Sequence, residues 1–142
     1  GSAIAAQDAV VKFAKLGFEV EFNMDFHYML SRIPYLNEND VFIAISMSGK
    51  TKDVLDMMHV AKSYGAKIIA ITNLDKSPLY KKADIRLATP TVEADFRIAS
   101  IASRMTQLTV IDTLYVSIFN QIGERMLDKF HAARDHVIRL RR

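Results

Sequence analysis

The sequence contains no cysteine and no tryptophan among its 142 residues. Without cysteine the chain can form neither disulfide bonds nor a thiolate metal site, and this composition fits a reducing compartment. No apolar run approaches the roughly 20 residues that a membrane-spanning helix needs. The first ten residues contain neither a basic segment nor a long apolar core, so we expect no secretory signal peptide. Together these absences predict a cytoplasmic protein.

Metal-binding patterns are missing from the sequence as well. The four histidines are His27, His59, His131 and His136. None of them has the spacing of a zinc site, and no carboxylate pair completes a ligand set around the last two. We therefore predict no metal and no other cofactor.

The composition is otherwise that of an ordinary globular domain. Half of the residues are hydrophobic and a quarter are charged, and the length suits one domain with a single substantial core. The net charge is only +3, but basic residues gather in 129–142. Such a cluster is either a solvated helix end, which we favour, or a surface for nucleic acid or an acidic partner. Because no aromatic residues alternate with the basic ones, we predict no nucleic-acid binding by this domain itself.

Helical and strand patterns alternate along the first 90 residues of the chain. Apolar spacing and end signals predict helices at 3–16, 24–33, 51–64 and 76–82. Alternating or continuous β-branched and aromatic runs predict strands at 19–22, 41–46, 67–72 and 85–88. The alternation predicts an α/β fold, a three-layer α-β-α sandwich with a parallel sheet of about four to five strands.

From about Asp95 onward the pattern is helical only, and Gly123 is the expected break before a final helix to about Leu140. A wide apolar stripe follows the first of these helices: Ile98, Ile101, Met105, Leu108, Ile111, Tyr115, Ile118, Phe119 and Ile122. A sheet of this size leaves part of so wide a stripe uncovered. We therefore predict that the helix spanning 98–122 forms the contact surface of a homodimer or larger homo-oligomer.

The segment SMSGKT, residues 46–51, directly follows a buried strand and precedes a helix. A turn in this position presents backbone N–H groups and the positive end of a helix dipole to an anion. A nucleotide-binding P-loop also requires a glycine five positions before Gly49, and the chain has Ala44 there. The segment is therefore not a P-loop.

Three hydroxyl groups lie around the glycine of this segment, from Ser46, Ser48 and Thr51. Short hydroxyl donors beside a glycine that admits close backbone approach suit the oxygens of a phosphomonoester. Ser48 alone would be explained equally well as a helix N-cap. For the whole set we favour a phosphate site. Lys50 has two open interpretations: its ammonium group adds positive charge to the site, or it points to water.

These motifs together resemble the sugar isomerase (SIS) domain, and more narrowly the effector domain of RpiR-type bacterial transcriptional regulators. SMSGKT fits the family's phosphate loop, Ser-x-Ser-Gly-x-Thr/Ser. The family's long-helix pattern and its Ser-Pro-Leu are met by Phe96, Arg97, Ser103, Arg104, Gln107, Leu108, Ile111, Asp112, Ser77, Pro78 and Leu79. The resemblance covers essentially the whole chain.

The resemblance implies a sugar-phosphate site, which we expect to contain Ser2, Ser46, Met47, Ser48, Gly49, Lys50, Thr51 and Glu93. Ser2 falls at the serine of the family's first loop, Gly-x-Gly-x-Ser. Glu93 matches the acidic residue that related isomerases use as a base. We rank hydrogen bonding to sugar hydroxyls first for Glu93, a plain helix-terminal charge second, and a catalytic base third.

The function implied by the resemblance is that of a non-catalytic sugar-phosphate sensor. Residues 1–142 would form the SIS domain of a bacterial regulator of carbohydrate metabolism, whose first strand and N-terminal helix-turn-helix domain lie outside this sequence. Its expected partners are a phosphorylated sugar, a second copy of the chain and, through the helix-turn-helix domain, DNA. The alternative is a ketose–aldose phosphosugar isomerase of the same fold, for which Glu93 lacks a convincing histidine partner.

Overall fold

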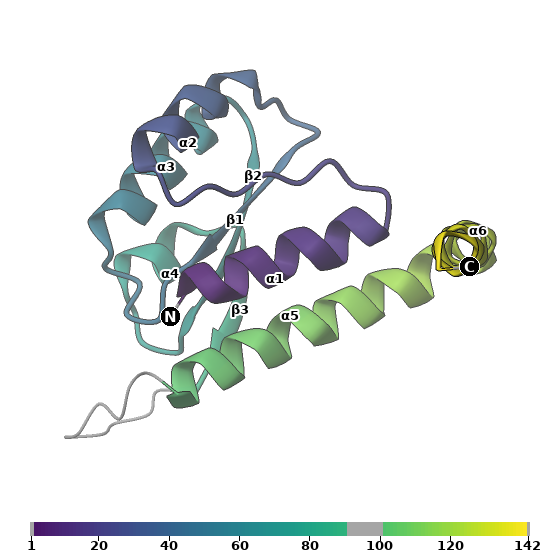
Figure 1. Ribbon diagram of the computed structural model, residues 1–142. Coiled ribbons are helices and arrows are strands. Elements are labelled where there is room, and N and C mark those ends of the chain that lie inside the picture. The colour runs from purple at the N-terminus through teal and green to yellow at the C-terminus, as the bar shows by residue number, and fades with distance from the viewer. Residues whose placement is uncertain (1, 91–100, 142) are drawn as a thin grey trace.

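The computed structural model describes residues 2–90 and 101–141, and within them a parallel sheet of three strands forms the centre of the molecule (Figure 1). The strands are β1 (Val41–Ile45), β2 (Lys67–Asn73) and β3 (Ile85–Thr89), hydrogen-bonded in that order. In register, Val41 pairs with Lys67 and Ile69 pairs with Ile85. All three carboxyl ends therefore lie at one edge of the sheet.

The described residues also form six α-helices and a short 3-10 helix at Ile33–Tyr35. The α-helices are α1 (Ser2–Lys15), α2 (Phe26–Arg32), α3 (Lys52–Ser63), α4 (Pro78–Lys82), α5 (Ile101–Ile122) and α6 (Glu124–Leu140). Local sequence explains several of their ends. The Asp25 carboxylate caps α2 by accepting from the backbone N–H of His27 and Tyr28. Ser77 caps α4, and Pro78 occupies the first helical position, where its missing N–H costs nothing.

Each face of the sheet has its own buried cluster. Ala44 and Ile68 pack with Met58 of α3, on the side that α4 also covers. Ile45 and Ile71 point the other way and belong to the cluster beneath α1 and α5. Helices therefore cover both faces, and the predicted three-layer α-β-α sandwich is confirmed.

The number of strands differs from the prediction, since the described residues contain three rather than four or five. The segment 19–22, predicted as a strand, is extended but pairs with no described strand. It is tied to α2 instead, because the Glu21 carboxylate accepts hydrogen bonds from Tyr28 Oη at 2.6 Å and Arg32 Nε at 3.0 Å. Both bonds lower the pKa of Glu21, and the bond from Tyr28 has the larger effect.

The long apolar stripe is divided between the core and the surface. Ile111 is fully buried, and Leu108 and Phe119 pack against the cluster shared with α1. Met105 and Val116 remain exposed on the outer side of α5. Part of the stripe predicted to contact another chain is therefore core of this one.

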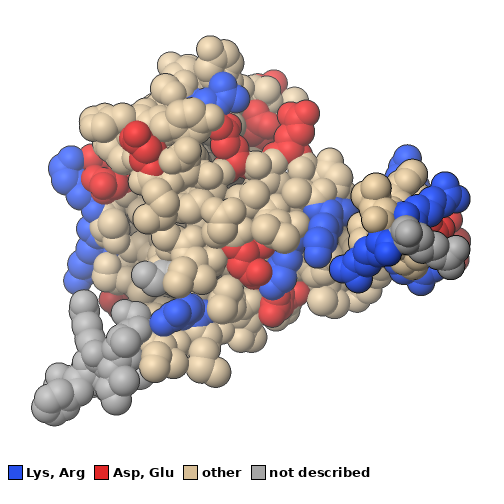
Figure 2. All heavy atoms as spheres, in the orientation of Figure 1, with Lys and Arg blue, Asp and Glu red and all other residues tan. Residues whose placement is uncertain are grey.

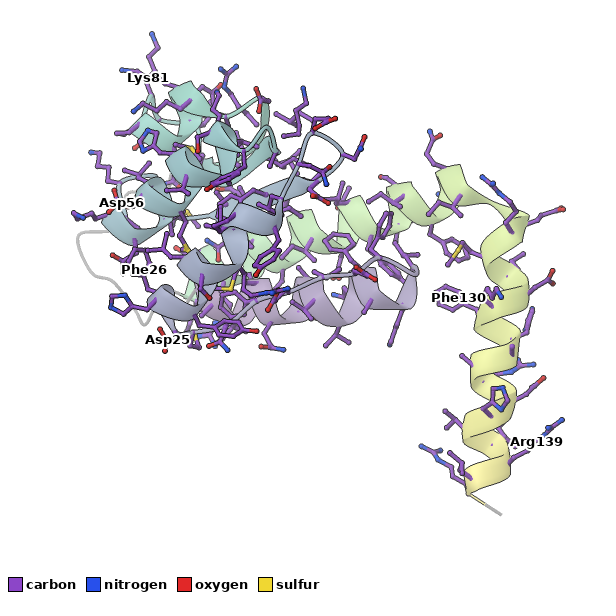
Figure 3. The ribbon with its side chains drawn as sticks, turned by 90° about the horizontal axis from the view of Figure 1, so that it is seen from above. Asp25, Phe26, Asp56, Lys81, Phe130 and Arg139 are labelled. Atoms are coloured by element: carbon purple, nitrogen blue, oxygen red, sulfur yellow. The ribbon has the colours of Figure 1, made fainter. Side chains whose placement is uncertain are left out.

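Helix α6 projects away from the sheet and turns out of the direction of α5 (Figures 1 and 3). None of its residues is buried in the described structure. Met126 and Phe130 pack against the cluster that α1 and α5 share, and Phe130 lies edge-to-face on Phe119 with ring centroids 5.5 Å apart. Among the described residues, no helix combines the length and apolar character required to cross a bilayer.

Candidate functional site

The SMSGKT loop connects the carboxyl end of β1 to the first turn of α3. Backbone hydrogen bonds fix its path: Ser46 N donates to Ile71 O at 3.1 Å, and Asn73 N donates to Met47 O at 3.1 Å. The loop therefore continues the pairing of β1 with β2 beyond the last residue of β1. Its position is set by the sheet.

The hydroxyls within the loop have different surroundings. Ser46 is buried, and its Oγ lies 2.8 Å from Thr51 Oγ1 and accepts from Gly49 N at 3.2 Å. Ser48 and Thr51 are exposed, and Ser48 Oγ accepts from Lys50 N at 3.2 Å. Ser46 thus closes the loop from inside by bonding to Thr51 and Gly49, while Ser48 and Thr51 remain accessible from outside.

Thr51 occupies the N-cap position of α3 without capping it. Its backbone is extended, as an N-cap requires, but its side chain makes no hydrogen bond to the first-turn N–H groups of the helix. The hydroxyl lies against Ser46 instead. The N–H groups of the first turn, at the positive end of a 12-residue helix, are therefore left to an external acceptor.

Gly49 holds the loop close to two other elements. Its φ of +63° belongs to the left-handed region that glycine adopts without strain. A Cβ at this position would lie 2.0 Å from Ser77 Oγ and 2.9 Å from Thr72 Oγ1. Leu79 N, in α4, donates to Gly49 O at 3.1 Å. The loop is therefore packed tightly between β2 and α4.

Buried polar residues gather around this edge of the sheet. Those within the described part of the chain are Ser46, Thr72, Ser77, Thr89 and Gln107. The first four follow or brace the strand ends, and Thr89 Oγ1 donates to Thr72 O at 3.3 Å. Since polar side chains are costly to bury, their concentration at one edge indicates a functional region.

Ser2 and Gln107 approach the same end of the molecule from α1 and α5. Gln107 is 1% exposed, and its Nε2 donates to Ser2 Oγ at 3.0 Å. One turn after Ser2, Ala5 packs in the buried cluster that contains Ile45, the residue before Ser46. Figure 1 shows the N-terminus at the end of the sheet where α4 lies.

The predicted site residues therefore fall into three groups. The structure places Ser46, Met47, Ser48, Gly49, Lys50 and Thr51 in one loop, and Ser2 at the same end of the sheet. Lys50 is exposed at the tip of the loop, whereas Met47 is half-buried. Glu93 lies outside the described residues, as do Phe96 and Arg97.

Sequence reasoning did not assign a role to three residues of this region: Ser77, Thr89 and Gln107. Ser77 carried a usable signal, because serine before proline is typical of a helix N-cap. Thr89 directly follows the strand predicted at 85–88, at the carboxyl end of a parallel strand, where ligands bind in sheets of this kind. Gln107 had no local signal, since its partner lies 105 residues away.

Comparison with known proteins gives the family directly. The model of the SIS domain matches residues 1–117. The chain belongs to the SIS domain family. Over 115 residues it is 40% identical to an uncharacterized HTH-type transcriptional regulator of Caldanaerobacter subterraneus, an alignment covering 81% of this chain and 41% of that protein. This SIS chain thus spans less than half the length of that regulator.

Solved structures share the fold at low sequence identity. NanR of Vibrio vulnificus, complexed with ManNAc-6P, superposes with a TM-score of 0.86 over 98% of this chain and 52% of its own, at 22% identity. The sugar isomerase domain of an RpiR transcription factor from Sphaerobacter thermophilus has a TM-score of 0.72, 20% identity and coverages of 94% and 73%. A Listeria monocytogenes protein provisionally named a sugar-phosphate isomerase has a TM-score of 0.75, 24% identity and coverages of 86% and 65%.

Proposed function

We propose that this SIS chain is the sugar-phosphate-sensing effector domain of an RpiR-type bacterial transcriptional regulator. The observation that carries the proposal is the SMSGKT loop, in which Thr51 leaves the first turn of α3 uncapped and both Ser48 and Thr51 are exposed residues. This arrangement supplies hydrogen-bond donors and no carboxylate from the loop itself, which suits a phosphate dianion. The complex of NanR with ManNAc-6P supports the choice of ligand class.

Within this proposal each loop residue has a separate task. Ser48 and Thr51 donate to phosphate oxygens together with first-turn N–H groups of α3. Gly49 allows the close approach, and Lys50 contributes positive charge at the rim. The buried Ser46 keeps the loop closed by bonding to Thr51 and Gly49. Glu93 is proposed to accept hydrogen bonds from sugar hydroxyls.

We also propose that the domain senses its ligand without turning it over. The similarity to an HTH-type regulator supports this role. The alternative function, that of a phosphosugar isomerase, is supported by the structural similarity to a protein provisionally named an isomerase. Isomerisation requires a positioned base and acid at the sugar carbons. If Glu93 is a base, a sugar C–H proton exchanges with deuterated solvent; a pure sensor gives binding without exchange in NMR spectra.

The domain is further proposed to act as a homodimer in the cytoplasm, and to reach DNA only through a helix-turn-helix domain of the parent protein. Exposed apolar side chains on α5 and α6 support self-association. On α6, Phe130, Ala133, Val137 and Leu140 lie three or four residues apart, on one helix face. The α5–α6 elbow has an apolar hollow of about 220 Å³, lined by Tyr115, Val116, Phe119, Leu127 and Phe130.

Loop variants test the phosphate site. Ser48→Ala and Thr51→Ala are each expected to weaken sugar-phosphate binding roughly tenfold or more, because each removes a donor to a charged acceptor. Isothermal titration calorimetry measures the change. Ser63→Ala, at the opposite end of α3, is the matched control and should leave affinity unchanged. Equal affinities for wild type and both loop variants would refute the assignment of the loop.

A further inference from the structure

Gln107 carries a polar atom that nothing in the described structure satisfies. Its Oε1 is the one buried side-chain nitrogen or oxygen without a hydrogen-bond partner among residues 2–90 and 101–141. Gln107 itself is 1% exposed and precedes Leu108, which packs against the cluster that α1 and α5 share. An unsatisfied buried acceptor costs about 1–3 kcal/mol. A leucine or methionine here would avoid that cost, so stability alone does not explain a glutamine.

The structure places the amide nitrogen of Gln107, rather than its oxygen, against Ser2. Gln107 Nε2 donates to Ser2 Oγ at 3.0 Å, so the serine oxygen acts as acceptor. The Ser2 hydroxyl proton is then available for a ligand, because the Ser2 hydroxyl donates to no acceptor among the described residues. In the opposite amide orientation, that proton would be spent on Oε1 and Ser2 would only be able to accept from a ligand.

This direction matters because of what the neighbouring loop is proposed to bind. A phosphate dianion offers only acceptors, so a serine helps to bind it only when its own proton points to the ligand. Ser2 lies half-buried at the end of the sheet that carries SMSGKT, in the turn of α1 that leads to Ala5. The two segments therefore lie at the same end of the sheet, one directly after β1 and the other in the first turn of α1.

We propose that Gln107 is a positioning residue for ligand binding: it donates to Ser2 Oγ and thereby directs the Ser2 hydroxyl proton to a phosphate oxygen of the bound ligand. The inference rests on the proposed function, since it assumes a phosphate at the SMSGKT loop. It adds a determinant on α5, the helix that also carries the exposed apolar face. Ligand contact is thereby coupled to the packing of α1 on α5.

The test uses inorganic phosphate as the probe, titrated at constant ionic strength and followed by ³¹P NMR, because this anion reports on the site without requiring the natural sugar. Gln107→Met preserves the size of the side chain and removes both amide groups. We expect phosphate affinity to fall about tenfold. Urea denaturation should show unchanged or increased stability, because the unsatisfied oxygen is gone. A merely structural glutamine would give the reverse result: lower stability with affinity retained.

A double-variant cycle tests whether Gln107 acts through Ser2. Ser2→Ala should weaken phosphate binding, and adding Gln107→Met to it should weaken binding no further. An additional tenfold loss in the Ser2→Ala background would overturn the positioning role. Thr51→Ala distinguishes a failure of the proposed phosphate site from a failure of the positioning role of Gln107. Loss of binding in Thr51→Ala with full binding in Gln107→Met would refute this inference and leave the phosphate loop standing, whereas a wild-type protein that binds no phosphate would refute both.

Discussion

Gly49 is the residue at which the geometry of the loop is most tightly constrained. Sequence reasoning predicted that Gly49 lets a ligand approach the backbone closely, and this stays a prediction; the structure shows a separate reason for glycine, the crowding by Ser77 and Thr72. The hydroxyls were also predicted, but their division of labour was not. Ser46 and Thr51 are five residues apart, and only the folded turn brings their oxygens to 2.8 Å. The sequence alone does not reveal whether the hydroxyl of a serine such as Ser46 binds a ligand or bonds to other residues of its own loop.

Replacing Gly49 by alanine should destabilise the domain and abolish phosphate binding. The new Cβ would meet Ser77 Oγ at 2.0 Å and Ser77 Cβ at 2.6 Å, so that either the loop or α4 must shift. Gly17→Ala is the matched control, since Gly17 also has a positive φ, +87°, but no atom within 4 Å of its Cβ position. Urea denaturation should show a loss of about 1–2 kcal/mol for the control and about 1–3 kcal/mol more for Gly49→Ala. Equal losses would show that the packing around Gly49 is loose.

At the scale of helices and strands, the sequence predicted nearly every element because each carries a local signal. Two expectations depended on tertiary context: the strand predicted at 19–22 was wrong, whereas the subunit contact predicted for α5 stays a prediction although part of its stripe is core. The segment 19–22 alternates as a strand does, yet a strand also needs a neighbour with free backbone groups. The apolar stripe of α5 was assigned to a subunit contact, yet much of it, including Ile111, packs within the same chain. Periodicity shows that a face is buried without showing what buries it.

The start of β3 is fixed to β2 by a carboxylate that should make stability depend on pH. Asp84 Oδ2 accepts from Ile68 N at 2.8 Å, and this bond lowers the pKa of Asp84 below its ordinary value of 3.8. A carboxyl with a lowered folded-state pKa stabilises the fold above its unfolded pKa. That stability is lost as pH falls through the folded pKa.

Asp84→Asn should therefore flatten the acid side of the stability profile. The neutral amide still accepts from Ile68 but does not titrate, so the free energy of unfolding should fall less steeply between about pH 5 and pH 3 than in wild type. Urea denaturation at a series of pH values measures both slopes. Asp75→Asn removes a carboxylate from an exposed bend and serves as the control. An unchanged slope in Asp84→Asn would contradict the role of the Ile68 bond.

At the scale of the whole molecule, the shape suggests that one chain is not the complete functional unit. Figure 3 shows α6 with Phe130 and Arg139 on a helix that extends away from the remaining elements. Basic side chains gather on its surface in Figure 2, with five Lys or Arg and three Asp or Glu between 124 and 141. Val137 and Leu140 are exposed at 49% and 87%. An amphipathic helix whose apolar residues toward its end remain exposed favours the proposed contact with a second copy.

Val137→Glu should convert an assembly into a 16.1 kDa monomer, because it places a charge in the proposed contact while touching none of the core. Light scattering at micromolar concentration measures the mass. Val11→Glu makes the same change at an equally exposed valine on α1, 49% against 49%, and should leave the assembly intact. Ile111→Glu is unsuitable, since Ile111 is fully buried within the chain. A monomeric wild type would refute the contact.

The most direct test of the central claim, that SMSGKT binds the phosphate group of a phosphorylated sugar, is thermal unfolding of the wild-type chain with matched ligands. Each sugar phosphate is compared with the same sugar lacking phosphate, at equal concentration and ionic strength. A ligand that binds only the folded state raises the melting temperature by mass action. The account predicts a concentration-dependent rise with at least one sugar phosphate and none with its unphosphorylated counterpart. Equal stabilisation by both sugars of such a pair, or no response to any sugar phosphate, would contradict it.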